Sequence, residues 1–206
     1  FNYKKNILIN AGNSGTFARL LLGLLIKCPY EIKIVGDPSL SKRDFLRIIS
    51  PLEKFGAQFK YKNKGKLPLK ILGSKFLKPI NYFEKRGSAQ CKSSVILAAL
   101  NTPGKTIINA KKSRDHTELL FKYLKIPIQI KKRNKKYDYI KVKGIKKVEP
   151  LNYKIPGDIS SCAFFIVLTL LSKRSQLLIK NINVNPTRIG IIKILTMMGA
   201  KIKFIN

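Results

Sequence analysis

The chain has 206 residues, 45% of them hydrophobic, which is enough to fill the core of one large domain or of two smaller ones. No apolar run reaches the roughly 18 residues of a membrane span, and the first residues do not form a secretory signal, so we expect a globular cytoplasmic protein. Three cysteines and one histidine without metal-ligand spacing argue against a metal site.

The formal charge of +32 comes mostly from lysines that occur in every segment of the chain. A basic RNA-binding module is therefore one hypothesis, with Tyr61, Tyr137 and Tyr139 as the aromatic side chains it would use. No stacking motif or clustered basic stripe accompanies these tyrosines. The charge alone therefore gives this hypothesis little weight.

Three copies of one order of elements are predicted along the chain. Each copy begins with a helix that opens from a loop of small residues, and a short β-rich run follows it. A polar loop then leads to a second helix, which ends near the start of another strand. The first helices are expected at 15–26, 89–100 and 159–171, the β-rich runs at 31–35, 105–109 and 176–180, and the later strand starts at 55–59, 124–128 and 198–202. Last strands are expected near 67–72 and 137–143, in the first two copies only.

The predicted unit is β-α-β-α-β-β, which indicates an α/β fold with parallel crossovers. Residue Phe1 begins in what resembles the end of a strand, and we expect the chain to be an internal fragment of a longer protein. A shift in composition over residues 144–150 marks a linker between the second and third copies.

The loops that open the first helices are candidate anion sites. They cover residues 12–16, 87–90 and 157–161, and their spacing is regular: Ser88 follows Gly15 by 73 residues, and Asp158 follows Ser88 by 70. Small residues at a helix start leave backbone N–H groups unpaired at the positive end of the helix dipole. Such a site favours phosphate or carboxylate ligands.

Arginines recur at the second loops of the copies. Only eight of the 42 basic residues are arginine, and three of them, Arg43, Arg114 and Arg188, are separated by 71 and 74 residues. A planar guanidinium can bind an oxyanion through two parallel hydrogen bonds, which a lysine cannot do. A solvated surface position is the alternative for any single arginine.

Six of these segments together resemble the enolpyruvyl transferases, and among them the EPSP synthase family. The segments occur in the family's order and cover nearly the whole chain. They are residues 12–16 with Arg19, 36–43, 88–93, 113–118, 156–161 and 183–188. The resemblance implies the inverse α-β prism type of fold, in a protein of two domains. Residues 1–149 would be two units of the first domain, and residues 150–206 an incomplete unit of the second.

The resemblance also implies a reaction. In the family, the enolpyruvyl group of phosphoenolpyruvate is transferred to the 5-hydroxyl of 3-phosphoshikimate with release of phosphate, on the route to chorismate and the aromatic amino acids. It implies no cofactor, a monomeric full-length protein, small-molecule partners, and neither nucleic acid nor membrane as a partner. The family's catalytic groups would lie before Phe1 and after Asn206, so we expect no turnover from this chain alone.

The resemblance assigns substrate contacts within the chain. Gly15, Arg43 and Gln90 match the phosphoenolpyruvate site, and Ser88, Ala89, Gln90 and Arg114 match the 3-phosphoshikimate site. The missing side chain of Gly15 would let its backbone approach the ligand, which also implies sensitivity to glyphosate. A plain helix-start glycine is the alternative for Gly15, and a surface residue at a helix start is the alternative for Arg114.

Four polar residues in the same segments are expected to have structural roles. We interpret Asp158 as the N-cap of the helix that follows it, and not as a catalytic acid. Asn185 and Arg188 are expected to be structural, and His116 to be a hydrogen-bonding residue at a helix start. The nearest alternative enzyme transfers enolpyruvyl to a UDP-amino sugar, UDP-N-acetylglucosamine, but residues 39–43 and 113–118 fit it poorly.

Overall fold

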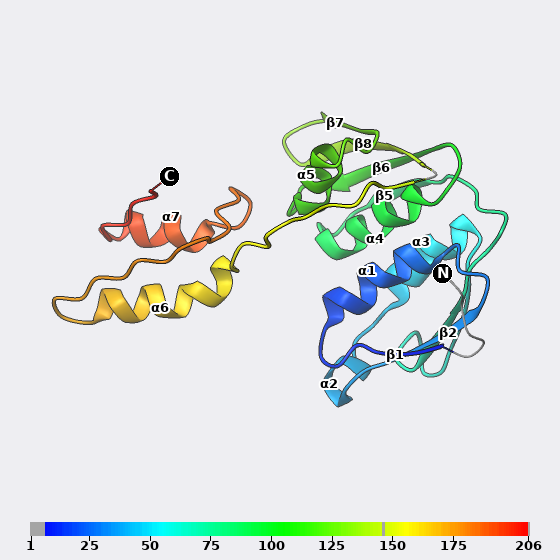
Figure 1. Ribbon diagram of the computed structural model, residues 1–206, viewed down its shortest axis with the longest axis horizontal. Helices are drawn as coiled ribbons and strands as arrows, with labels where there is room; N and C mark the ends of the chain where they lie inside the picture. Colours follow the sequence, from blue (N-terminus) through cyan, green and yellow to red (C-terminus); the bar gives the residue numbers. More distant parts are fainter. Residues whose placement is uncertain (1–6, 146, 206) are drawn as a thin grey trace. The chain divides into compact units, whose positions relative to one another are not determined.

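The computed structural model describes residues 7–145 and 147–205, and the chain divides into two compact units, Phe1–Glu149 and Pro150–Asn206 (Figure 1). The expectation that Phe1 begins in a strand lies outside the described residues. No helix in the described ranges is both long and apolar enough to cross a bilayer.

The first copy of the repeat forms a mixed sheet of four strands with its helices. The strand order is β1-β2-β4-β3, with β1 and β2 parallel and the other two pairs antiparallel. The short helix α2 lies within the polar loop, where no helix was predicted. The elements are β1 (Ile7–Asn10), α1 (Gly15–Leu25), β2 (Glu31–Val35), α2 (Pro38–Ser41), α3 (Leu46–Phe55), β3 (Gln58–Tyr61) and β4 (Leu69–Leu72).

The second copy repeats the same topology, with strand order β5-β6-β8-β7 and one parallel pair, β5 with β6. The repeat predicted from the spacing is therefore confirmed for these two copies. The elements are β5 (Asn81–Glu84), α4 (Ala89–Leu100), β6 (Lys105–Lys111), α5 (His116–Tyr123), β7 (Ile128–Lys132) and β8 (Tyr137–Lys143).

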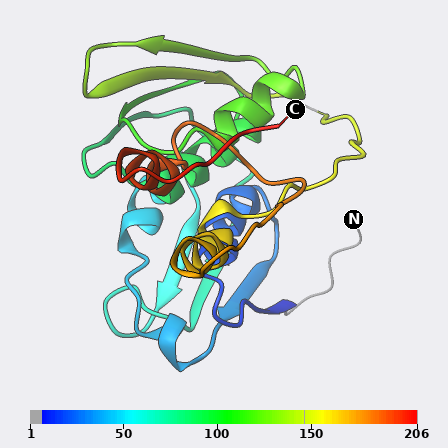
Figure 2. The same ribbon diagram turned by 90° about the vertical axis from the view of Figure 1, so that its left-hand side faces the viewer.

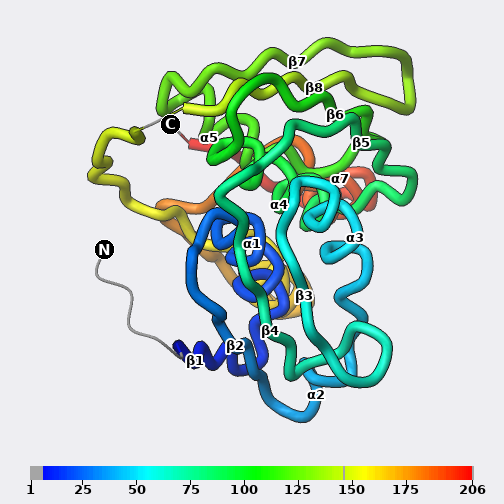
Figure 3. Tube along the Cα trace, turned by 90° about the vertical axis from the view of Figure 1, so that its right-hand side faces the viewer, coloured from blue at the N-terminus to red at the C-terminus, as the bar shows by residue number. Residues whose placement is uncertain are grey.

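Helices α1 and α4 pack against each other between the two sheets and form the centre of the core (Figure 1, Figure 3). Leu22 of α1, Ile26 at its C-cap, and Val95 and Ile96 of α4 are fully buried. A Cβ at Gly23 would clash with the backbone carbonyl oxygen of Ser94, so glycine permits this close helix contact. The packing brings the N-termini of α1 and α4 to neighbouring positions.

The second helices of the three copies end in residues with positive φ. Gly56 ends α3 in the left-handed conformation with a φ of 114°, and Gly199 follows α7 (Gly190–Met197) with a φ of 93°. At the corresponding place after α5, Lys125 adopts a φ of 54° although it is not glycine. Glycine therefore ends two of the three second helices.

The second unit contains α6 (Ile159–Leu171) and α7 (Gly190–Met197), joined by an extended segment (Figure 2). The strands predicted at 176–180 and 198–202 are wrong. Within the described part of this unit the only β pairing is a single parallel bridge between Gly157 and Ile182. A β-rich sequence becomes a strand only where a neighbouring strand satisfies its backbone groups, and these two runs have no such neighbour here.

Candidate functional site

The N-terminus of α1 lies beside two guanidinium groups. Ser14 caps the helix, and its Oγ accepts a hydrogen bond of 3.1 Å from the Phe17 backbone N–H. Gly15 is the first helical residue and is buried. A Cβ placed on it would lie 3.2 Å from Nη1 of Arg19 and 3.2 Å from Nη1 of Arg43. Both cations therefore flank the backbone of Gly15, where the helix dipole is also positive.

The loop around α2 places Arg43 over this helix start. Asp37 caps α2 by accepting a 2.6 Å hydrogen bond from the Leu40 backbone N–H, and its other oxygen accepts a 2.5 Å bond from Asn13 Nδ2. The Leu40 hydrogen bond is the main cause that lowers the pKa of Asp37. Arg43 is exposed, and its Nη2 donates a long hydrogen bond of 3.4 Å to Asn13 Oδ1. No carboxylate in the described residues forms an ion pair with Arg43.

Arg19 is held in the interior beside Arg43. Its residue is 8% exposed, its guanidinium lies 5.2 Å from the centre of the Phe45 ring, and its Nη1 donates a 2.6 Å hydrogen bond to Gln90 Oε1. Burial lowers the pKa of Arg19, and the charge of nearby Arg47 lowers it further. Its Nε has no hydrogen-bond partner among the described residues. Arg19, Arg43 and Arg47 therefore create a positive region, and none of the three forms an ion pair with a described residue.

Gln90 connects the two helix starts. It lies in the first turn of α4, accepts from Arg19, and donates through Nε2 to Thr16 Oγ1 at 2.7 Å. These two bonds fix which end of the amide is the donor, and they leave the second hydrogen of Nε2 available. Ser88 caps α4 by accepting from the Cys91 backbone N–H at 3.3 Å, and Ala89 is the first helical residue. The structure thus brings Gly15, Arg43, Gln90, Ser88 and Ala89 to the paired N-termini of α1 and α4.

The start of α5 is fixed to α4 by two side-chain contacts. Lys92 Nζ and Glu118 Oε1 are 2.6 Å apart with side chains only 3% and 4% exposed, and Thr117 Oγ1 donates to Ser93 Oγ at 2.7 Å. Arg114 lies just before this helix and is exposed. No described hydrogen bond joins it to Ser88, Ala89 or Gln90, so only the position of its loop relates it to them. His116 is the first residue of α5, as expected.

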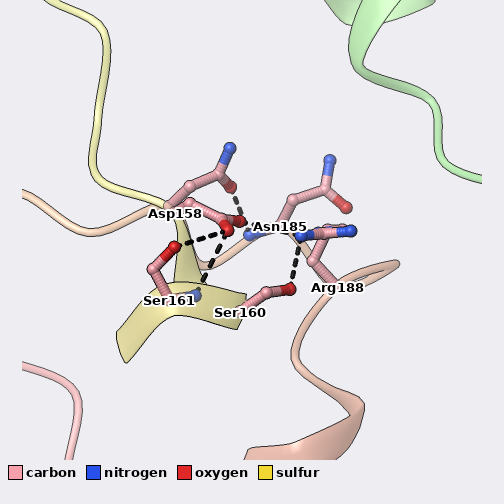
Figure 4. A network of polar contacts seen from close by, with 6 residues as sticks. Asp158, Ser160, Ser161, Asn185 and Arg188 are labelled. Atoms are coloured by element: carbon pink, nitrogen blue, oxygen red, sulfur yellow. Dashed lines mark hydrogen bonds and ion pairs between the residues drawn. The ribbon is translucent and has the colours of Figure 1, made fainter. Parts of the chain in front are cut away.

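A second polar cluster lies in the unit Pro150–Asn206, at the start of α6 (Figure 4). Asp158 Oδ2 accepts from the backbone N–H of Ser161 at 3.2 Å, which confirms its predicted role as an N-cap. Its Oδ1 lies 2.8 Å from Arg188 Nη2, which also donates to Ser160 Oγ at 2.6 Å. Asn185 Oδ1 accepts from the backbone N–H and the hydroxyl of Thr187. Asp158 and Arg188 therefore hold the two helix starts of this unit together, and Asn185 stabilises the loop before α7.

Two residues at the paired N-termini of α1 and α4 were not predicted as site residues from the sequence. Arg19 follows Gly15 by four positions, so it lies on the same face of α1 one turn later, and this spacing could have indicated it. Glu84 is buried and accepts from the backbone N–H groups of Arg86 and Gly87, at 3.1 and 2.5 Å, so it shapes the loop before Ser88. No feature of the sequence distinguished Glu84 from other acidic residues.

Comparison with known proteins agrees with this architecture. Residues 1–205 match the family model described as EPSP synthase (3-phosphoshikimate 1-carboxyvinyltransferase). Two curated relatives of that name are those of Petrotoga mobilis, 44% identical over 97% of this chain, and Caldicellulosiruptor saccharolyticus, 45% identical over 100% of it. The solved structure of EPSP synthase from Acinetobacter baumannii has a TM-score of 0.83 at 37% identity and covers 97% of this chain.

The alignments cover only part of each relative. This chain spans 46% and 48% of the two curated relatives and 44% of the solved structure. The mixed α/β architecture with two similar sheets is shared with that structure, so the expected fold class is confirmed. The match over nearly every residue, together with the repeated units, shows that this chain belongs to the EPSP synthase (3-phosphoshikimate 1-carboxyvinyltransferase) family.

Proposed function

We propose that the paired N-termini of α1 and α4 bind phosphoenolpyruvate and 3-phosphoshikimate in an enzyme that transfers the enolpyruvyl group between them. The observation that carries the proposal is the pair of guanidinium groups at Gly15, both 3.2 Å from its missing Cβ and neither paired with a carboxylate among the described residues. Family membership supports the choice of these two ligands, because the relatives are named for this reaction.

The residues of the site have distinct tasks in this proposal. Arg43 is exposed and weakly bonded, so its guanidinium can turn to a carboxylate or phosphate and form two parallel hydrogen bonds. Gly15 lets the ligand approach the backbone N–H groups of α1 without meeting a side chain. Gln90 offers its remaining amide hydrogen from a fixed orientation. Arg19 is buried, so it contributes charge and holds Gln90 without direct exposure.

The second ligand is assigned to the start of α4. The Ser88 hydroxyl and the first backbone N–H groups of α4 supply donors to a phosphate, and Ala89 supplies only its backbone. Arg114 is proposed to contact the same ligand from the adjacent loop. During transfer, the acceptor hydroxyl adds to the enolpyruvyl group and phosphate leaves, so negative charge moves between oxygens that fixed donors can stabilise. The residues named here bind and orient, and none of them is assigned a proton transfer.

The remaining expectations belong to the same proposal. The unit Phe1–Glu149 would be two units of the first domain of a two-domain enzyme, and the unit Pro150–Asn206 part of the second. The working enzyme would be monomeric and cytoplasmic and would need no cofactor or nucleic acid. Since the chain spans less than half of its relatives, we expect it to bind ligands but not to turn them over alone.

A titration followed by NMR tests the proposal. The ¹⁵N-labelled 206-residue chain is titrated with phosphoenolpyruvate and with 3-phosphoshikimate. We expect the amide signals of Gly15 and Thr16 to shift with the first ligand and those of Ser88 and Ala89 with the second. Arg43→Met should weaken phosphoenolpyruvate binding, while Arg174→Met, which removes the same charge from an exposed turn, should not. Equal shifts with UDP-N-acetylglucosamine or with a polynucleotide would contradict the assignment.

A further inference from the structure

The N-caps of the first helices in the three copies differ in charge. Ser14 caps α1, Ser88 caps α4 and Asp158 caps α6. Each side chain accepts a hydrogen bond from the backbone N–H three residues later, at 3.1, 3.3 and 3.2 Å. The local capping contact is therefore the same in all three copies. A carboxylate has a second oxygen and a negative charge that a serine hydroxyl lacks.

In the third copy, that second oxygen binds the arginine of the same copy. Asp158 Oδ2 makes the cap, and Oδ1 lies 2.8 Å from Arg188 Nη2 (Figure 4). Although burial acts in the opposite direction, the hydrogen bond from Arg188 brings the pKa of Asp158 below its ordinary value. The side chain of Arg188 is 22% exposed. Its charge is thus neutralised by the helix cap itself.

In the first copy, the corresponding arginine has no carboxylate partner in the part of the copy that the structure describes. Arg43 precedes the second helix of its copy as Arg188 does, and its guanidinium lies over residues Asn13 and Gly15, on either side of the cap. The single oxygen of Ser14 already accepts from Phe17. Two carboxylates of this loop have other hydrogen-bond partners: Asp37 accepts from Leu40 and Asn13, and Asp44 accepts from the Leu46 backbone N–H.

The second copy resembles the first in its cap and in its arginine. Its cap is also a serine, Ser88, and its arginine, Arg114, is exposed without a described ion pair. Two copies therefore combine a neutral cap with an available arginine, and one copy combines an acidic cap with an occupied arginine. We infer that the charge of the N-cap residue determines whether the arginine of each copy can bind an anion. Ser14 is thereby a specificity-determining residue for the phosphoenolpyruvate site. This inference rests on the proposed function of Arg43.

The test introduces the carboxylate of the third copy into the first. Ser14→Asp keeps a good cap but places a second, charged oxygen next to Arg43, whereas Ser14→Asn is an equally good cap without charge. Titration of the 206-residue chain with phosphoenolpyruvate is expected to give an affinity at least tenfold weaker for Ser14→Asp than for Ser14→Asn. A difference smaller than tenfold between the two variants overturns the inference.

A ligand-free measurement separates this inference from the proposed function. Guanidinium NMR signals of the arginines report whether each side chain is held by an ion pair. We expect Arg188 to be held in the natural chain and released in Asp158→Asn, and Arg43 to be held only in Ser14→Asp. If the natural chain does not bind phosphoenolpyruvate, the proposed function fails, and these signals still decide the inference. An Arg43 signal that is the same in Ser14→Asp and Ser14→Asn would overturn it.

Discussion

The buried ion pair between Lys92 and Glu118 gives the sharpest prediction for stability. The two side chains are 3% and 4% exposed, their charged atoms are 2.6 Å apart, and the second oxygen of Glu118 has no partner among the described residues. Lys92→Met would leave a buried carboxylate without its cation. Breaking a buried pair from one side costs about 3–5 kcal/mol. For a protein of this size, that corresponds to a fall in the unfolding midpoint of roughly 6–20 °C.

Thermal and urea unfolding followed by circular dichroism would measure this effect. The double variant Lys92→Met with Glu118→Met removes both charges, so it should recover most of the lost stability. Lys147→Met is the matched control, because its pair with Glu149 is 3.2 Å long and about three-quarters exposed, and such pairs contribute only ~0.2–1 kcal/mol. A single variant that loses less than 1 kcal/mol, or a double variant no more stable than the single, would refute the reasoning.

Three further predictions concern the helix starts. Gly15→Ala should displace the Arg43 guanidinium and so weaken the binding of phosphoenolpyruvate and of glyphosate, measured by isothermal titration. The control Gly190→Ala is also at a first helical position but has no atom within 4 Å of the new Cβ, so it should leave binding unchanged. Arg43→Lys should reduce phosphoenolpyruvate affinity about tenfold or more, because the two-pronged contact is lost; unchanged affinity would show that only the charge matters. The pKa of Asp158 is lowered in the folded state, so its ionised side chain stabilises the fold above the ordinary aspartate value of about 3.9, and this stabilisation is lost as the pH falls through the lowered value. Asp158→Asn should not show this acid-dependent loss of stability, and parallel profiles of stability against pH for the two proteins would contradict the assignment.

The helices and their starts could be predicted from the sequence because their signals are local. A small polar residue before an apolar run indicated the N-cap at Asp158, whose side chain accepts from the backbone N–H three residues later. Loops of small residues also indicated the starts of α1 and α4, which Ser14 and Ser88 cap in the structure. The regular spacing of the copies along the chain also predicted that the first two share a topology. A contact between residues within four positions of each other depends only on the local sequence, so the sequence is enough to predict it.

The contacts that assemble the site could not be predicted in the same way. The hydrogen bond between Arg19 and Gln90 joins residues 71 positions apart, and it depends on the packing of α1 against α4. The run at 176–180 shows the opposite case, because its sequence is typical of a strand but no neighbouring strand pairs with it in the described residues. Pairing partners and helix contacts are properties of the assembled fold.

The net charge of +32, which suggested only an RNA-binding module, does not locate the candidate site. Exposed lysines are strongly hydrated, and salt screens their charges beyond about 8 Å at physiological ionic strength. Arg19 differs because it is buried beside a helix N-terminus and has no ion pair within residues 7–145 and 147–205. Water and salt screen the field of such a buried charge much less. A small acidic ligand can therefore distinguish one pair of arginines from many lysines. That distinction depends on the burial of Arg19 and on the lack of an ion pair at either guanidinium group among the described residues. These properties follow from how α1, α4 and the loop around α2 pack together.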